Sequence, residues 1–360
     1  MKYFIPTATA FILCLLACNT KDTKPGEAIK PDFVFENLDT TMNPGTDFFQ
    51  YANGGWIKKN PIPADQSSWG IGNLVIEENI KRLREISESA ALAPNSIKGS
   101  ADQMIGDFWT AGMDSAKIEH DGLKYLQPYL TLIEEAKDLP ALINVVTELK
   151  KIGSGAFFAD FVAQDDKNSD AMAYIFYQGG IGLPEREYYF KNDSATINIR
   201  EKYADYISKM LQLTGHTPEA AIASGKNILS METKFAQGSR KIEDLRDPYA
   251  NYNKMAINQL NKISPVIDLQ QFLNKTGVNN IDSVIVGQPD FFKSMNTVVK
   301  ATPLATLKDY VRFNLVSDFA SALPNAYVNT SFEYSKLFSG ATEMRPRWKR
   351  VMSRQENLIG

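Results

Sequence analysis

Cysteine and histidine are the rarest residues of this sequence, with two of each among 360 residues. The cysteines, Cys14 and Cys18, lie close together near the N-terminus, so the rest of the chain has no thiol for a disulfide or a thiolate metal site. Neither His120 nor His216 lies in an H-E-x-x-H motif, which places two imidazoles on one helix face beside a glutamate. The sequence therefore predicts no zinc site within this chain, and both histidines are expected at the surface or in turns.

Other signals of function are also missing. There is no G-x-S-x-G nucleophile motif, and Gly179-Gly180-Ile181-Gly182 lacks the Lys and Ser/Thr of a phosphate-binding loop. The 39 Lys and Arg residues are balanced by 42 Asp and Glu residues, and this formal net charge of −3 argues against a nucleic-acid partner. With 44% hydrophobic and 22% charged residues, the composition is typical of a globular protein with one large or two medium domains.

The N-terminus has the pattern of an exported protein. An apolar stretch after Lys2 predicts a signal peptide over residues 1–17, and no later segment reaches the roughly 18 apolar residues of a membrane-spanning helix. Leu15-Leu16-Ala17-Cys18 has the form of a bacterial lipobox, which predicts that Cys18 becomes a lipidated N-terminus; an ordinary signal peptide that contains a cysteine is the alternative. Residues 18–31 are polar and predict a flexible tether. We therefore expect a protein anchored by lipid to a membrane of the bacterial cell envelope.

Most of the remaining sequence has helical periodicity. Helices are expected over residues 67–93, from Ser100 onward, and over 123–136, 139–150, 197–213, 218–235, 264–273 and 303–323. The period changes between 156 and 177, where two aromatic and β-branched runs flank a polar turn and predict a β-hairpin. The rings of Phe157, Phe161, Tyr174 and Phe176 are expected to be buried. The predicted fold class is mainly α with one small β-hairpin, which excludes Rossmann and sandwich architectures.

The most distinctive stretch lies between Asn43 and Trp56. Asn43-Pro44-Gly45 predicts a turn, Thr46 is suited to cap a helix, and Phe48 and Tyr51 give that helix an aromatic face. On composition alone this predicts a core helix. Two adjoining glycines, Gly54 and Gly55, would weaken the helix or let another backbone approach it closely.

Read as a string, the same stretch carries a family resemblance. The pattern P-G-x-D-F-F-x-Y-x-N-G-x-W, followed by Ile62-Pro63, resembles the N-terminal signature of the neprilysin-like zinc metalloendopeptidases, peptidase family M13. The segment Gly180–Tyr189, G-I-G-L-P-E-R-E-Y-Y, is similar to a second family segment. Further similar segments are Arg246-Asp247-Pro248 with Tyr252-Asn253, and Arg345-Pro346-Arg347-Trp348-Lys349-Arg350. The four segments occur in the family's order.

The resemblance implies a division of the chain. Family members are about twice as long, and their H-E-x-x-H motif and remaining catalytic residues lie in a C-terminal half. Residues 32–344 would then be the N-terminal domain, mostly a helical lid lobe of a two-lobed metallopeptidase, and 345–360 the truncated start of the catalytic domain. The implied partners are peptide substrates and the catalytic C-terminal half of the same protein. Zinc would belong to the full-length protein, with none bound by this chain alone.

The resemblance supplies no catalytic, cofactor-binding or metal-ligating residue within this chain. In mammalian members, arginines after the Ile-Pro motif help hold a substrate's C-terminal carboxylate. Here that region reads Ser67-Ser68-Trp69-Gly70, so no substrate contact is transferred. Glu185 and Glu187 flank Arg186 and are expected to form a structural ion-pair cluster. The chain alone is therefore expected to be inactive.

A second function remains open at this point, namely a non-catalytic helical surface lipoprotein that binds a nutrient or a partner. The ordered set of four segments favours the peptidase, because a lipoprotein of unrelated descent has no reason to carry them.

The lipobox generates a direct test. Radiolabelled palmitate fed to an expressing bacterium should enter the wild-type chain and the Cys14→Ala control, and should be absent from Cys18→Ala. Equal labelling of the wild type and Cys18→Ala would contradict lipidation at this residue.

Overall fold

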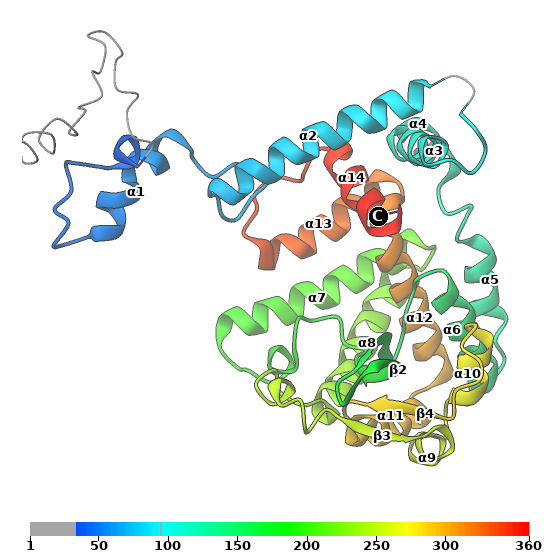
Figure 1. Cartoon of the computed structure of the whole chain (residues 1–360). Coiled ribbons are helices and arrows are strands. Elements are labelled where there is room, and N and C mark those ends of the chain that lie inside the picture. The colour runs from blue at the N-terminus through cyan, green and yellow to red at the C-terminus, as the bar shows by residue number, and fades with distance from the viewer. Residues whose placement is uncertain (1–33, 94–95, 360) are drawn as a thin grey trace, which may run out of the picture. The chain divides into compact units, whose positions relative to one another are not determined.

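The computed structural model describes residues 34–93 and 96–359 (Figure 1). The signal peptide over 1–17, Cys18 and the tether over 18–31 lie outside these residues. The chain divides into two compact units between Pro63 and Ala64, and each is described by itself. Helices dominate both units, so the predicted mainly α fold is confirmed. Within the described ranges, no helix is long and apolar enough to cross a membrane.

The first unit holds a 3₁₀ helix, Phe35–Asn37, and α1, Phe48–Lys59. The capping residue of α1 is Asp47, whose carboxylate accepts a hydrogen bond from the Gln50 amide at 2.9 Å, so the cap lies one residue beyond the predicted Thr46.

The glycines of α1 allow a close backbone approach. A Cβ on Gly55 would lie 2.8 Å from the Leu38 carbonyl oxygen, so only glycine fits against the preceding segment. The aromatic face is open: Phe48 is 69% exposed and Phe49 is 67% exposed. Within this unit the core-helix prediction is therefore wrong.

The second unit begins with helices that pack around a small core. They are α2 (Ile71–Leu92) and α3 (Ala101–Met113), joined near the end of the chain by α14 (Arg347–Ile359). The short helix α4 (Ser115–Asp121) follows α3. α2, α3 and α14 contact one another, and the buried residues between them are Trp109, Val351 and Met352. Ser100 caps α3 as predicted, accepting from the Gln103 amide.

A second group of helices surrounds the larger core. They are α5 (Gln127–Glu135), α6 (Leu139–Lys151), α7 (Ser194–Leu213), α8 (Pro218–Gly238), α9 (Ile257–Ile263), α10 (Leu269–Lys275), α11 (Pro289–Ala301), α12 (Leu304–Phe319) and α13 (Asn325–Ser339). The helix predicted over 264–273 starts only at Leu269, because Asp268 supplies the cap for its first turn. α9, α11 and α13 were not predicted.

The predicted hairpin is confirmed, but it is part of a larger sheet. β1 (Phe158–Asp165) and β2 (Asn168–Gln178) pair antiparallel. β4 (Ser283–Val286) pairs parallel with β2, and β3 (Asn253–Ala256) pairs antiparallel with β4. Among the described residues this gives a four-stranded sheet in the order β1-β2-β4-β3.

In β1 the residues that face the core lie one position later in the sequence than predicted. Phe157, Tyr174 and Phe176 are buried as expected, whereas Phe161 is 46% exposed. Phe157 has a φ of 70° and precedes the strand, so the in-and-out alternation starts at Phe158. Phe161 therefore faces outward, where its ring lies 6.3 Å from that of Tyr177.

On the inner face, Phe158 and Phe176 contact Phe272 of α10 and Phe292 of α11. The buried aromatic side chains of the hairpin thus reach helices that are far away in sequence. This contact fixes the sheet against the larger core.

Two matched substitutions test this alternation. Phe176→Ala should lower the free energy of unfolding by ~3–5 kcal/mol, because it empties a fully buried aromatic site. Phe161→Ala on the outward face should cost less than about 1 kcal/mol. Denaturant unfolding followed by circular dichroism measures both, and equal losses would contradict the assignment of faces.

Candidate functional site

The structure places the two histidines apart and gives neither a metal partner. His120 on α4 has an 87% exposed side chain, in agreement with the expected surface position. His216 lies in the turn after α7, but it is partly buried and its Nε2 is 3.0 Å from Asp309 Oδ1. In the described ranges, no group of three or more His, Cys, Asp or Glu side chains could hold a metal ion. Cys18 lies outside these ranges.

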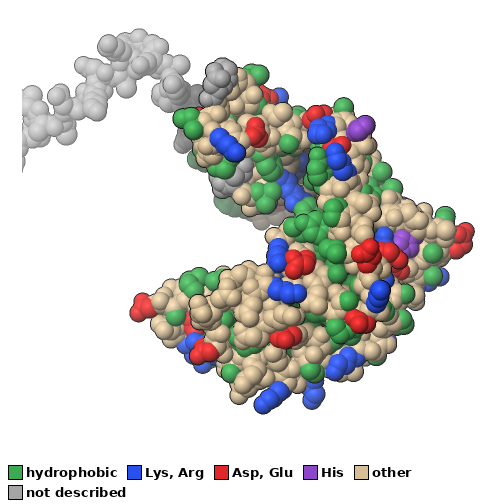
Figure 2. All heavy atoms as spheres, turned by 90° about the vertical axis from the view of Figure 1, so that its right-hand side faces the viewer, with side chains coloured by type: hydrophobic (Ala, Val, Ile, Leu, Met, Phe, Trp, Pro, Cys, Tyr) green, Lys and Arg blue, Asp and Glu red, His purple; other side chains and the backbone are tan. Residues whose placement is uncertain are grey.

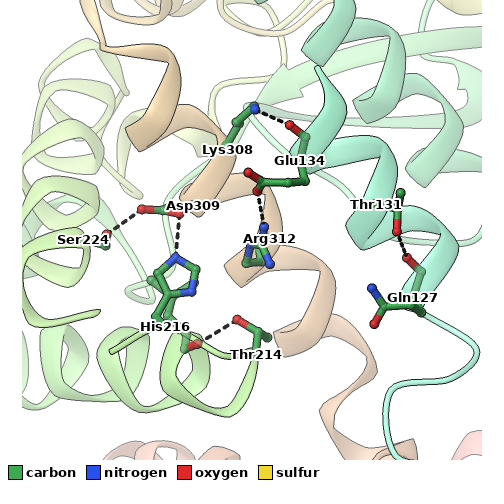
Figure 3. A network of polar contacts seen from close by, with 10 residues as sticks. Gln127, Thr131, Glu134, Thr214, His216, Ser224, Lys308, Asp309 and Arg312 are labelled. Carbon is green, nitrogen blue, oxygen red and sulfur yellow. Dashed lines mark hydrogen bonds and ion pairs between the residues drawn. The ribbon is translucent and has the colours of Figure 1, made fainter. Parts of the chain in front are cut away.

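The contact of His216 belongs to a network that ties helices together (Figure 3). Ser224 Oγ donates to the other oxygen of Asp309 at 2.5 Å, so serine and histidine share the carboxylate and are not bonded to each other. In a hydrolytic triad the histidine must receive the serine proton, so this arrangement cannot activate the hydroxyl. Its effect is to fix α8 and the α7–α8 turn to α12.

A second set of polar contacts in the same view joins α5 to α12 (Figure 3). Arg312 donates to Glu134 at 2.7 Å, and Lys308 donates to the backbone carbonyl of Glu134. Outside these contacts charge is mixed: on the face shown in Figure 2, Lys and Arg side chains are interspersed with Asp and Glu side chains.

The segment Gly180–Tyr189 is held by a buried carboxylate. Glu232 of α8 is 1% exposed and accepts three hydrogen bonds. They come from the Tyr203 hydroxyl at 2.8 Å, the Tyr189 hydroxyl at 2.6 Å and the Gly182 amide at 3.1 Å. Tyr334 of α13 adds a bond to the Gly182 carbonyl at 2.8 Å. The carboxylate therefore joins α7, α8 and the motif segment directly, and α13 through Gly182.

Glycine is the residue type that fits at position 182. A Cβ added there would lie 2.0 Å from the Tyr203 hydroxyl oxygen, which is well inside contact distance. The glycine of the G-L-P pattern is thus required by close packing against a buried tyrosine.

Burial raises the pKa of Glu232 to about 7, although the hydrogen bonds from Tyr189, Gly182 and Tyr203 act in the opposite direction. No Lys or Arg is among its hydrogen-bond partners in the part of the chain that the structure describes. Burial also raises the pKa of Tyr189 and of Tyr203 well above the usual value, so both remain hydroxyl donors.

The charged residues of the same motif have structural roles. Glu185 accepts from the Glu187 amide at 2.9 Å and caps the 3₁₀ helix Arg186–Tyr189. Arg186 pairs with Glu187 at 3.6 Å and donates to the Ala236 carbonyl at 3.1 Å. The expected ion-pair cluster is thus found in part: Glu187 pairs with Arg186, whereas Glu185 acts as a helix cap. Both glutamates have structural contacts, which is the role that the sequence predicted for them.

The third motif anchors a loop to the sheet. Asn253 donates to the Val286 carbonyl at 3.0 Å, and the Tyr252 hydroxyl donates to Asp165 at 2.8 Å. Lys254 pairs with Asp165 at 2.9 Å, which holds the pKa of this carboxyl at about 2. Tyr252-Asn253 therefore links the end of β1, at Asp165, to the end of β4, at Val286.

The fourth motif lines a cavity of about 200 Å³ between α2 and α14. Its wall combines apolar residues such as Ile76 with polar ones such as Arg345, and includes Trp69 from the segment after Ile-Pro. Lys349 is neutralised by Glu77 at 2.7 Å. Concave sites that combine apolar residues with a few polar groups are typical of ligand-binding pockets. Sequence reasoning missed the cavity, because Arg345 and Trp69 are far apart in the chain and the fourth motif gave no sign of which segment it packs against.

The comparisons with known proteins agree with the four motifs. The sequence model of Peptidase family M13 matches residues 44–360. Endothelin-converting enzyme 1 of Rattus norvegicus is 29% identical over 347 residues, which cover 91% of this chain and 44% of that protein. The chain thus spans about half the length of the relatives that it matches.

A solved structure is also similar. The zinc metalloprotease Zmp1 of Mycobacterium tuberculosis, in complex with an inhibitor, matches with a TM-score of 0.84 and 27% identity over 90% of this chain and 50% of that one. The open state of Zmp1 matches with a TM-score of 0.77, again at 27% identity, over 89% of this chain and 50% of that one.

The buried carboxylate makes stability depend on pH. The pKa of Glu232 is 4.5 in its reference state and about 7 in the fold, so between these values the folded state binds more protons than the unfolded state. The free energy of unfolding should therefore fall by roughly 3 kcal/mol through this term as pH rises from 4.5 to 7. Glu232→Gln removes the slope, since an amide does not ionise, while Glu201→Gln on the exposed face of α7 keeps it. Urea unfolding at several pH values measures the difference, and parallel pH curves for wild type and Glu232→Gln would refute it.

Proposed function

This chain belongs to peptidase family M13, and we propose that it is the N-terminal, substrate-enclosing portion of a zinc metalloendopeptidase that hydrolyses peptides. The proposed division follows the resemblance: 32–344 is the N-terminal domain, mostly a helical lid lobe, and 345–360 begins the catalytic domain. The alternative of a non-catalytic lipoprotein is disfavoured by family membership.

An uncovered apolar surface on α2 carries this proposal. Ser87 is the buried residue of this 22-residue helix, while Ile71, Val75 and Ile76 are each more than half exposed. Exposed apolar residues grouped on the first turns of a helix are typical of a surface that packs against another element. Phe48 and Phe49 are similarly exposed on α1. We propose that the catalytic half of the same protein covers these surfaces.

The zinc is proposed to lie in that catalytic half. Two histidines and no H-E-x-x-H in these 360 residues leave this chain without the usual ligands of a catalytic site, which needs three protein side chains and an open position for water. This chain would contribute enclosure of the peptide. The cavity between α2 and α14, with Trp69 and Arg345 in its wall, is the concave surface that we propose to face the substrate.

The location is proposed from the lipobox. Cys18 would carry the acyl chains, and residues 18–31 would hold the folded part away from the membrane. Several acyl chains on one residue give stable anchoring, whereas one chain binds a membrane reversibly.

The test compares two polypeptides: residues 19–360, and a version extended by a catalytic half from the same gene. The short form should contain no stoichiometric zinc and show no chelator-sensitive cleavage of a quenched peptide. The extended form should show both. Stoichiometric zinc and cleavage in the short form would overturn the proposal, and so would an extended form that folds and lacks them.

A further inference from the structure

A pocket of about 200 Å³ lies beside the second motif and has no residue in common with the cavity between α2 and α14. Its wall is formed by the end of β2, residues 181–186 and the segment that follows α8. A cavity of about 150 Å³ can hold a molecule the size of benzene, so this pocket has room for one side chain of a ligand.

Two arginines line this pocket, and backbone carbonyls hold both of them. Arg186 Nε donates to the Ala236 carbonyl at 3.1 Å. Arg240 Nη1 donates to the Ala250 carbonyl at 3.0 Å and to the Asn251 side-chain oxygen at 3.2 Å. These bonds fix the two guanidinium groups before a ligand arrives, which lowers the entropic cost of binding.

The backbone of Arg240 is fixed as well. The side-chain oxygen of Gln178 accepts from the Arg240 amide at 2.8 Å, and Gln178 Nε2 donates to the Arg240 carbonyl at 3.1 Å. The end of β2 therefore positions this arginine.

Both guanidinium groups have N–H groups without an acceptor among the described residues. They are Nη2 of Arg186, and Nε with Nη2 of Arg240. The Nε–Nη2 edge of a guanidinium presents two parallel N–H groups, which is the geometry that a carboxylate accepts. In Arg240 this whole edge is free, because the structural bonds use Nη1.

The charges and apolar residues of the wall indicate the kind of ligand. Arg186 is paired with Glu187 at 3.6 Å, whereas no carboxylate of the described chain pairs with Arg240. Glu185 also lies in the wall and would repel a second negative charge. Ile242 in the same wall is 51% exposed, so an apolar group in the pocket would cover it. A ligand with one negative charge and an apolar part fits these features.

We propose that this pocket binds a singly charged carboxylate attached to an apolar group about the size of one amino-acid side chain. The carboxylate accepts from the free edge of Arg240 and from Nη2 of Arg186. The apolar group lies against Ile181, Ile242 and Leu245. The C-terminal residue of a peptide and a free branched-chain acid share this chemistry. The site does not depend on the proposed peptidase activity.

Saturation-transfer NMR on the full chain with Cys18→Ser tests the site, since this variant has no thiol for acylation at residue 18. The probe 4-methylpentanoate supplies a carboxylate and a branched apolar chain, and 4-methylpentanamide is its uncharged match. The acid should bind saturably at millimolar concentrations, and the amide about tenfold more weakly. Acetate and inorganic phosphate lack the apolar chain and should also bind about tenfold more weakly than the acid.

Two matched variants test the role of Arg240. Arg240→Gln removes the free edge and should weaken binding of the acid about tenfold, and should abolish its preference over the amide. Arg246→Gln makes the same charge change on an exposed residue of the same segment, outside the pocket wall. It should change the dissociation constant less than about twofold. Circular dichroism checks that both variants are folded.

A second pair of variants leaves every bond of Arg240 in place. Ile242→Glu adds a negative charge to the wall and should weaken binding of the acid about fivefold, whereas Ile242→Lys should not weaken it. Ile222→Glu is the control, because Ile222 on α8 is similarly exposed and lies outside the wall.

Two tripeptides identify the source of the carboxylate, namely Ala-Ala-Leu with a free C-terminus and its C-terminal amide. Tighter binding of the peptide acid than of 4-methylpentanoate assigns the pocket to peptide C-termini, and the reverse order assigns it to free organic acids.

Three results would overturn the site: equal binding of acids and amides, no saturable binding of 4-methylpentanoate or of the peptide acid, or equal effects of Arg240→Gln and Arg246→Gln. None of these measurements needs zinc or a catalytic half, so failure of the site and failure of the proposed function are separately visible.

Discussion

The buried carboxylate of Glu232 is the interaction on which the larger core of the second unit, among helices α5 to α13 and the sheet, depends most. An ionised side chain in an apolar core is costly unless each oxygen has a donor, and here two tyrosines and a backbone amide provide them. These donors come from α7 and from the segment Gly180–Tyr189, and Tyr334 of α13 binds the same segment. Removing one partner would leave the charge underpaired, so the arrangement is cooperative. Replacing the whole set by apolar residues would remove the specificity with which the segment is placed.

Much of this fold could be predicted from local signals. The hairpin follows from aromatic and β-branched residues around a polar turn, and α3 begins where Ser100 can cap it. The one-residue error at Phe161 arose because alternation was counted from Phe157, whose positive φ takes it out of the strand. Sequence carries no clear sign of that backbone conformation in a phenylalanine. β3 is only four residues long, and such a strand is formed by its partner more than by its own propensity.

The buried carboxylate of Glu232 and the cavity between α2 and α14 were harder to predict from the sequence than the helices and the hairpin. The sequence contains one signal, and it concerns Glu232. Along α8, Ile228, Met231 and Phe235 form an apolar stripe, and Glu232 lies on it. A carboxylate on the buried face of a helix requires partners, so the pattern could have identified Glu232, though it could not have named Tyr189 or Tyr203. The cavity between α2 and α14 gave no such sign, because it depends on the distant packing of Arg345 beside Trp69.

The second and third of the motifs that reveal the family are therefore structural in this chain. Gly182 is required by a tyrosine hydroxyl, Glu185 caps a 3₁₀ helix, and Asn253 ties a loop to the sheet. Each of these residues restricts the backbone conformation around it. Such residues identify the fold, but they supply no group that could react with a substrate. Activity has to be argued from other features, such as ligand chemistry and uncovered surface. In this chain Gly182, Glu185 and Asn253 hold backbone segments in place, whereas the exposed apolar residues Ile71, Val75 and Ile76 of α2 and the cavity between α2 and α14 are the features from which a function is proposed.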